Sequence, residues 1–144
     1  MQRSLVMTRI LSLDDVPEML ELLHLILEYS GYECLGTTDE QEALSILRTQ
    51  SVDLYTQDFM RPGIGGWDFL RQMKSDSTLQ NIPVLGISAC RRVARAQQLK
   101  QHGLDIDRDL DGYLCKPFGP NELLDIVEAI LQKHSIALPS EEMR

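Results

Sequence analysis

Basic residues are scarce in this sequence of 144 residues: 14 lysines and arginines stand against 22 aspartates and glutamates, a formal net charge of −8. Proteins that bind a DNA or RNA backbone owe much of their affinity to clustered Lys and Arg side chains. Here the one basic cluster, Arg91 and Arg92 with Arg95, is small. The composition therefore argues against nucleic acid as a partner.

Cysteines and long apolar runs are scarce as well. Cys34, Cys90 and Cys115 are far apart and form no Cys-x-x-Cys pair, so the sequence predicts free thiols rather than a zinc site or a redox pair. No apolar run approaches the roughly 18–20 residues of a membrane span, and the first nine residues contain no signal-peptide pattern. We expect a cytoplasmic protein with no membrane partner.

What the sequence does contain is a regular alternation of short apolar runs with helical patterns, which is typical of α/β proteins. The runs predict strands at 9–13, 32–36, 52–57, 82–87 and 112–115, and the amphipathic stretches predict helices at about 16–30, 39–49, 67–74, 91–101 and 121–133. Right-handed crossovers with helices on both faces allow the strand order 2-1-3-4-5. We expect a flavodoxin-like, doubly wound, five-stranded parallel sheet with five helices.

The length suits one domain. A chain of this size can bury roughly 68–70% of the surface that its unfolded form exposes. Its 43% hydrophobic content is therefore enough to build a core without disulfides or metal. No internal repeat or linker divides the chain, so we expect a single domain over residues 1–134, followed by a frayed tail at 135–144.

Polar side chains follow four of the five predicted strands. Asp14 and Asp15 come after the first strand, Asp58 after the third, Ser88 after the fourth and Lys116 after the fifth. The carboxyl ends of parallel strands form the ligand-binding edge of an open sheet. These side chains are therefore expected to meet in one pocket.

Carboxylates in such a pocket need a positive partner. Two of them repel by about 4 kcal/mol at ~4 Å if the effective dielectric constant is ~20. Mg²⁺ suits the site because it takes one or two carboxylates, keeps several waters and accepts a phosphate oxygen. Lys116 offers a further point charge to a phosphoryl group. The set matches the needs of phosphoryl transfer: an oxygen nucleophile, a metal and a cation.

The sequence resembles a response-regulator receiver domain of two-component signalling over about residues 8–134. Four motifs carry the resemblance, each at a predicted strand end: Asp14-Asp15; the run 53–58 with Pro62-Gly63 and Gly66 after it; Ser88-Ala89; and the run 113–118. Each motif alone is weakly specific. All four in this order are strongly specific.

The resemblance implies a role for each site residue. Asp58 would attack the phosphorus of a phosphohistidine on a histidine kinase or phosphotransfer protein, giving an acyl phosphate. Lys116 would pair with Asp58 at rest and with a phosphoryl oxygen afterwards. Ser88 would hydrogen-bond the phosphoryl group, which lets Tyr113 change rotamer on the face made by the fourth helix, the fifth strand and the last helix.

The resemblance also implies the metal ligands. Asp15 would bind Mg²⁺ directly, Asp14 mainly through water, and Asp58 and the backbone carbonyl of Met60 would complete the protein ligands. The peptide bond between Lys116 and Pro117 would be cis, which costs little before proline.

The stretch from Ser88 to Lys116 is longer than the family pattern, and the acidic segment 105–111 accounts for the excess. Its Asp-x-Asp-x-Asp-Gly sequence at 107–112 resembles the opening of a calcium loop. That loop requires a glutamate at its twelfth position, which here is Phe118. We therefore expect a solvated acidic turn.

The sequence thus predicts a single-domain response regulator that phosphorylates itself on Asp58, dephosphorylates slowly and signals to a protein target. The ten residues after His134 are too few for a DNA-binding module. A receiver-like docking module that works without phosphorylation is the alternative. A dehalogenase-type phosphatase would need Asp-x-Asp after the first strand, and a flavin carrier would not place Asp14-Asp15 beside its phosphate.

Overall fold

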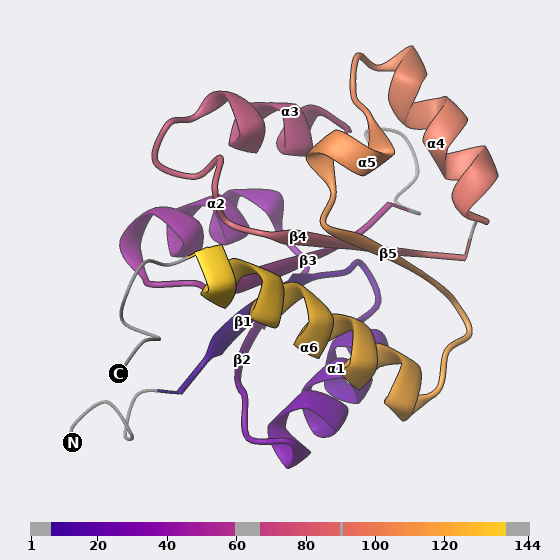
Figure 1. Ribbon diagram of the computed structural model, residues 1–144. Coiled ribbons are helices and arrows are strands. Elements are labelled where there is room, and N and C mark those ends of the chain that lie inside the picture. The colour runs from indigo at the N-terminus through magenta and orange to yellow at the C-terminus, as the bar shows by residue number, and fades with distance from the viewer. Residues whose placement is uncertain (1–6, 60–66, 90, 138–144) are drawn as a thin grey trace.

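The computed structural model describes residues 7–59, 67–89 and 91–137. Its centre is a parallel sheet of five strands in the order β2-β1-β3-β4-β5 (Figure 1). The strands are β1 (Arg9–Leu13), β2 (Glu33–Thr37), β3 (Leu54–Asp58), β4 (Val84–Ser88) and β5 (Gly112–Cys115). The predicted sheet and its strand order are confirmed.

Helices cover both faces of the sheet (Figure 1). They are α1 (Pro17–Tyr29), α2 (Glu40–Thr49), α3 (Trp67–Ser75), α4 (Arg92–Gln101), α5 (Ile106–Asp109) and α6 (Pro120–Ala137). Side chains of α1 and α6 share one hydrophobic core with the sheet, and those of α2, α3, α4 and α5 share the other. The described residues thus contain six helices where the sequence predicted five, and the additional one is α5.

The acidic segment is a short packed helix, so the prediction of a solvated turn is wrong. Asp105 caps α5 by accepting hydrogen bonds from two backbone N–H groups of the helix. Ile106 and Leu110 are buried in the core, and the Asp109 carboxylate is buried against Arg108 and the backbone N–H of Asp105. The apolar residues between the aspartates hold this segment against the sheet.

The start of α1 also differs from the prediction. The spacing of Asp15 and Glu18 is that of a capping box and favours Asp15 as the N-cap, but the N-cap is Val16 and makes no side-chain capping bond. The Asp14 carboxylate instead accepts a hydrogen bond from the Val16 N–H at 2.9 Å, and Pro17 brings no N–H that needs a partner. The side chain of Asp15 is left exposed.

The other helix signals agree with the structure. Gly31, with φ of +96°, is the C′ residue of α1, as is usual for glycine, and Asp39 caps α2. α6 continues to Ala137, past the predicted end at 133. Residues 138–144 lie outside the described part of the chain.

The free cysteines Cys34 and Cys115 lie on β2 and β5, at opposite edges of the sheet, as predicted. Burial raises the pKa of the Cys34 thiol to about 12, so this thiol stays protonated at neutral pH. Cys90 lies outside the described residues. Among the helices that the structure describes, none combines the length and the apolar character that a membrane crossing requires.

Gly86 on β4 lets the ring of Phe59 pack against the sheet. A Cβ at position 86 would lie 2.9 Å from Phe59 Cε2 and 3.1 Å from Leu110 Cδ1. We expect Gly86→Ala to lower the free energy of unfolding by about 1–3 kcal/mol, because both side chains are buried and an added methyl group overpacks the core. Urea denaturation measures this. Gly119→Ala is the control, since a Cβ there meets nothing within 4 Å; equal stability of the two variants would contradict the prediction.

Candidate functional site

The carboxyl ends of four strands meet at one edge of the sheet. Asp58 and Ser88 are the last residues of β3 and β4, while Asp14 and Lys116 directly follow β1 and β5. The parallel register places these ends side by side, and the Lys116 N–H donates a hydrogen bond of 2.8 Å to the Ser88 carbonyl. The fold therefore brings together residues that are up to 102 positions apart in the sequence.

Two buried carboxylates share one ammonium group at this edge. Asp14 and Asp58 are 1% and 4% exposed. Lys116 Nζ lies 3.3 Å from Asp14 Oδ2 and 3.6 Å from Asp58 Oδ1. This arrangement offsets the repulsion between the carboxylates but leaves the three groups with a net charge of −1 when all are ionised. Such a site attracts a further cation.

Of the two remaining predicted metal ligands, one has an exposed side chain and the other lies outside the residues that the structure describes. Asp15 follows Asp14 at the same edge with an exposed side chain, and Met60 lies outside the described residues. Within residues 7–59, 67–89 and 91–137, no three His, Cys, Asp or Glu side chains form a ready metal cluster. Mg²⁺ needs only one or two carboxylates besides water, and Asp14 and Asp58 offer the hard oxygen donors that it prefers. The donor set therefore fits this metal.

The chain leaves β5 through a cis peptide bond between Lys116 and Pro117, as predicted. The following residues lead to α6, which packs on the face of the sheet that carries α1. Lys116 is thus the last residue before this turn, and its side chain reaches back over the ends of β1 and β3.

The predicted switch residues also lie together. Ser88 is fully buried, and its Oγ accepts a hydrogen bond of 2.8 Å from Nη2 of Arg95 on α4. Burial raises the pKa of the half-buried Tyr113 hydroxyl, and hydrogen bonds with Ser88 and Arg95 partly offset the rise. The three side chains form one hydrogen-bonded group next to the carboxyl edge of the sheet.

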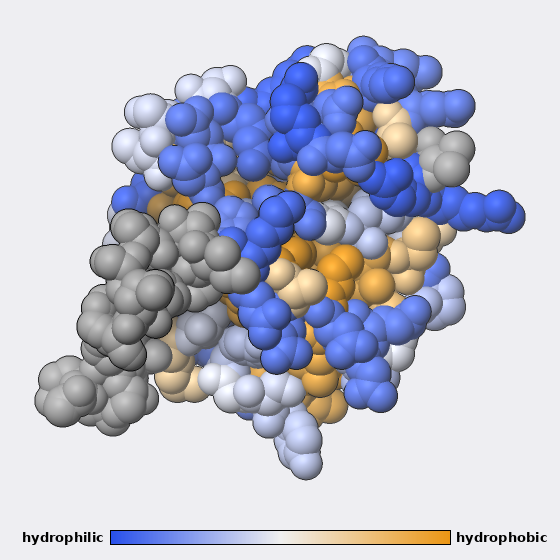
Figure 2. Space-filling view, in the orientation of Figure 1, coloured by the Kyte–Doolittle hydropathy of each residue, from blue (hydrophilic) through white to orange (hydrophobic). Residues whose placement is uncertain are grey.

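Arg95 is buried, which the sequence pattern did not predict. Arg95 belongs to the small basic cluster of the sequence, but it is 4% exposed, whereas Arg91 and Arg92 are exposed. Figure 2 shows that hydrophilic side chains gather over α4. The signal that could have found it is helical spacing: Arg95 precedes the fully buried Leu99 by four residues and so shares its inward face.

Aromatic rings surround the Arg95 guanidinium. Its Cζ lies 5.4 Å from the ring centroid of Trp67 and 6.0 Å from that of Phe59. The Trp67 ring stacks on Phe59 at 5.4 Å and on His102 at 4.9 Å. Gln98 accepts a further hydrogen bond from Arg95. Phe59 directly follows Asp58, so this cluster adjoins the acidic site.

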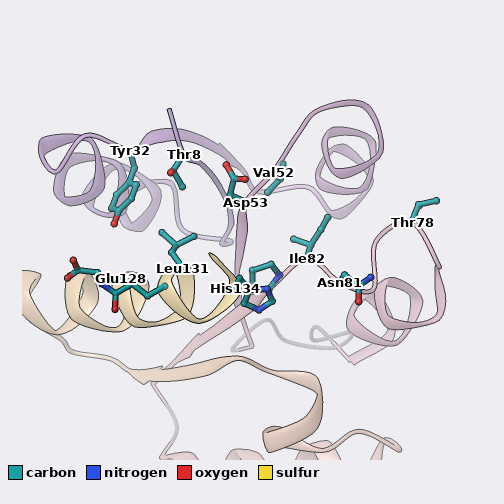
Figure 3. Close-up of a pocket in the computed structure, with 12 residues that line it drawn as sticks. Thr8, Tyr32, Val52, Asp53, Thr78, Asn81, Ile82, Glu128, Leu131 and His134 are labelled. Carbon is teal, nitrogen blue, oxygen red and sulfur yellow. The ribbon is translucent and has the colours of Figure 1, made fainter. Parts of the chain in front are cut away.

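A hollow of about 630 Å³ lies at the opposite end of the sheet (Figure 3). Thr8, Asp53 and Pro83 line it, and all three precede their strands. Two of its ionisable groups have partners: the Asp53 carboxylate accepts from the Arg9 N–H at 2.9 Å, and His134 Nε2 lies 3.3 Å from a carboxylate oxygen of Asp111. This hollow is separate from the site around Asp58.

The family model described as the response regulator receiver domain matches residues 10–128. The chain belongs to this family. The phosphate regulon transcriptional regulatory protein PhoB of Pseudomonas aeruginosa PAO1 is 32% identical over 124 residues, which cover 86% of this chain and 52% of that protein. This receiver domain thus spans about half the length of that relative.

Solved receiver structures have the same fold. The chemotaxis response regulator CheY4 of Vibrio cholerae superposes with a TM-score of 0.74 at 25% identity, over 87% of this chain and 99% of that chain. The receiver domain of a sensor histidine kinase from Pseudomonas aeruginosa PAO1 gives a TM-score of 0.74 at 21% identity, over 88% and 99%. That structure carries a magnesium ion coordinated in its active site cleft.

Proposed function

We propose that this receiver domain accepts a phosphoryl group on Asp58 from a phosphohistidine of a histidine kinase or phosphotransfer protein, with Mg²⁺ as cofactor. The observation that carries the proposal is the position of Lys116 Nζ, 3.3 Å from Asp14 and 3.6 Å from Asp58 at the carboxyl edge of the sheet. A cation between two buried carboxylates is the arrangement that phosphoryl transfer to an oxygen nucleophile needs.

In the proposed reaction a carboxylate oxygen of Asp58 attacks the phosphorus of the phosphohistidine. An O–P bond forms, the N–P bond breaks, and the partner's imidazole leaves with the electron pair. Lys116 follows the developing charge from the Asp58 carboxylate to a phosphoryl oxygen. Asp14, Asp15, Asp58 and the carbonyl of Met60 would hold Mg²⁺, which would supply positive charge to the phosphoryl oxygens.

The output follows from Ser88 and Tyr113. Ser88 would donate its hydroxyl hydrogen to a phosphoryl oxygen, and the movement of its loop would change the rotamer of Tyr113. The two side chains already hydrogen-bond each other, so a change at Ser88 is transmitted directly. The surface formed by α4, β5 and α6 would then present a different face to a partner.

The partners of this surface remain proposals. The sequence predicts a separate protein target, a cytoplasmic location and no nucleic acid, whereas the similar PhoB protein is named a transcriptional regulator and is about twice as long as the matched region. The phosphoryl-accepting site is common to both cases. The proposed phosphorylation of Asp58 therefore does not depend on which partner receives the signal.

Incubation with acetyl phosphate and Mg²⁺, followed by intact-mass spectrometry, tests the proposal. We expect one phosphoryl adduct per chain, which disappears on mild alkaline treatment because acyl phosphates are labile. A parallel sample in excess EDTA should show at least about tenfold less adduct, since the charge of the metal is missing. A folded protein that gains no adduct with Mg²⁺ would contradict the proposed function.

A further inference from the structure

The hydroxyl that the proposed function assigns to the phosphoryl group already has a charged partner in this structure. Ser88 Oγ accepts a hydrogen bond of 2.8 Å from the Arg95 guanidinium. We propose that Arg95 is a positioning residue that holds Ser88 in the resting arrangement, so that activation must break this bond. The inference rests on the proposed function and adds to it a residue that sets the balance between the two states.

The guanidinium cannot easily follow Ser88. Its plane lies near the rings of Trp67 and Phe59, and it donates to Gln98 one turn along the same helix. The helix itself is anchored by Leu99, which is fully buried. These contacts hold the arginine head in place beside Ser88.

The direction of the movement decides the effect. To hydrogen-bond a phosphoryl group on Asp58, the Ser88 hydroxyl has to move toward the end of β3, and we expect this movement to lengthen its distance from the anchored Arg95 head. Hydrogen bonds to charged groups are stronger than those between neutral groups, and more so in a buried setting. Loss of the bond between Arg95 and Ser88 raises the free energy of the arrangement in which Ser88 binds the phosphoryl group. Arg95 therefore opposes activation.

A buried arginine beside Ser88 could also have a second role, in which its removal changes the affinity for the phosphoryl group in the opposite direction. If its positive charge mainly attracted the phosphoryl group, its removal would weaken phosphoryl binding. The contacts favour the holding role, because the Arg95 head hydrogen-bonds Ser88, Gln98 and Tyr113 and lies against the rings of Trp67 and Phe59.

The experiment measures the affinity of the full chain for beryllofluoride, an analogue of the phosphoryl group, by calorimetry in Mg²⁺. We expect Arg95→Met to bind beryllofluoride about tenfold more tightly than the wild type, which corresponds to about 1.4 kcal/mol. The matched control is Arg92→Met. Arg92 lies on the same helix, is exposed and pairs with Asp107, so its replacement should leave the affinity unchanged.

A double-mutant cycle separates holding from a general structural effect. In a Ser88→Ala background the bond is already absent, so adding Arg95→Met should no longer tighten binding. If Arg95→Met does not fold, Arg95→Lys replaces it: the ammonium keeps the charge but is too short to keep the same bond, and binding should tighten at least about threefold.

Unchanged or weaker binding by the folded Arg95 variants would overturn the inference while leaving the proposed function intact. Equal tightening in the Ser88→Ala background would overturn it as well, because the effect would then not pass through Ser88. A wild-type protein that binds no beryllofluoride in Mg²⁺ would instead refute the proposed function, and the role of Arg95 with it.

Discussion

Asp58→Asn is expected to reduce phosphorylation by acetyl phosphate at least about a thousandfold, below detection in an intact-mass assay. The amide keeps the shape of the carboxylate but is a poor nucleophile for phosphorus. The variant should be at least as stable as the wild type without Mg²⁺, because it removes one of the two buried carboxylates that share Lys116. Loss of phosphorylation would thus not come from unfolding.

Asp53→Asn is the matched control for this variant. Asp53 precedes the same strand, β3, at its other end, and its exposed carboxylate accepts from the Arg9 N–H. It should be phosphorylated like the wild type. Phosphorylation of Asp58→Asn at the wild-type rate would show that another residue is the acceptor.

Lys116→Met is expected to slow phosphorylation by about 10²–10³-fold, because it removes a fixed positive charge from the group being transferred. The same change leaves Asp14 and Asp58 facing each other without compensation. We therefore expect the free energy of unfolding in EDTA to fall by about 3 kcal/mol, the cost of breaking a mostly buried ion pair. Adding Mg²⁺ should restore part of this stability, since a cation again separates the carboxylates.

Phosphorylation rates and urea denaturation, each measured with and without Mg²⁺, check both parts of this prediction. Lys133→Met is the control, because Lys133 is exposed on α6 and distant in sequence from the site. A Lys116→Met protein that is phosphorylated as fast as the wild type would rule out the charge role assigned to this lysine.

The main features of the fold and site could be predicted because they follow from periodicity and from strand ends. Each strand is a short apolar run, and the polar residue after it falls at the carboxyl edge once the sheet is parallel. Asp14, Asp58, Ser88 and Lys116 therefore needed no tertiary information to be grouped. The structure places Lys116 within 3.3 Å and 3.6 Å of the two aspartates.

The parts that could not be predicted are those where packing overrides residue type. In α5 the apolar residues Ile106 and Leu110 stand singly among aspartates, so the charge dominated the pattern. Arg95 has a side chain that is rarely buried unless paired, and the rings of Phe59 and Trp67 together with hydrogen bonds to Ser88 and Gln98 offset the cost of burying it. Neither environment is visible along the sequence.

We propose that Asp58 carries the phosphoryl group. Borohydride reduction of the phosphorylated protein is the most direct test of this assignment. Borohydride converts an aspartyl phosphate to homoserine, which peptide mass spectrometry locates in the sequence. We expect homoserine at position 58 in the sample treated with acetyl phosphate and Mg²⁺, and none in the EDTA sample. Homoserine at Asp14 or Asp15, or a phosphoryl group on another type of residue with position 58 unchanged, would contradict it.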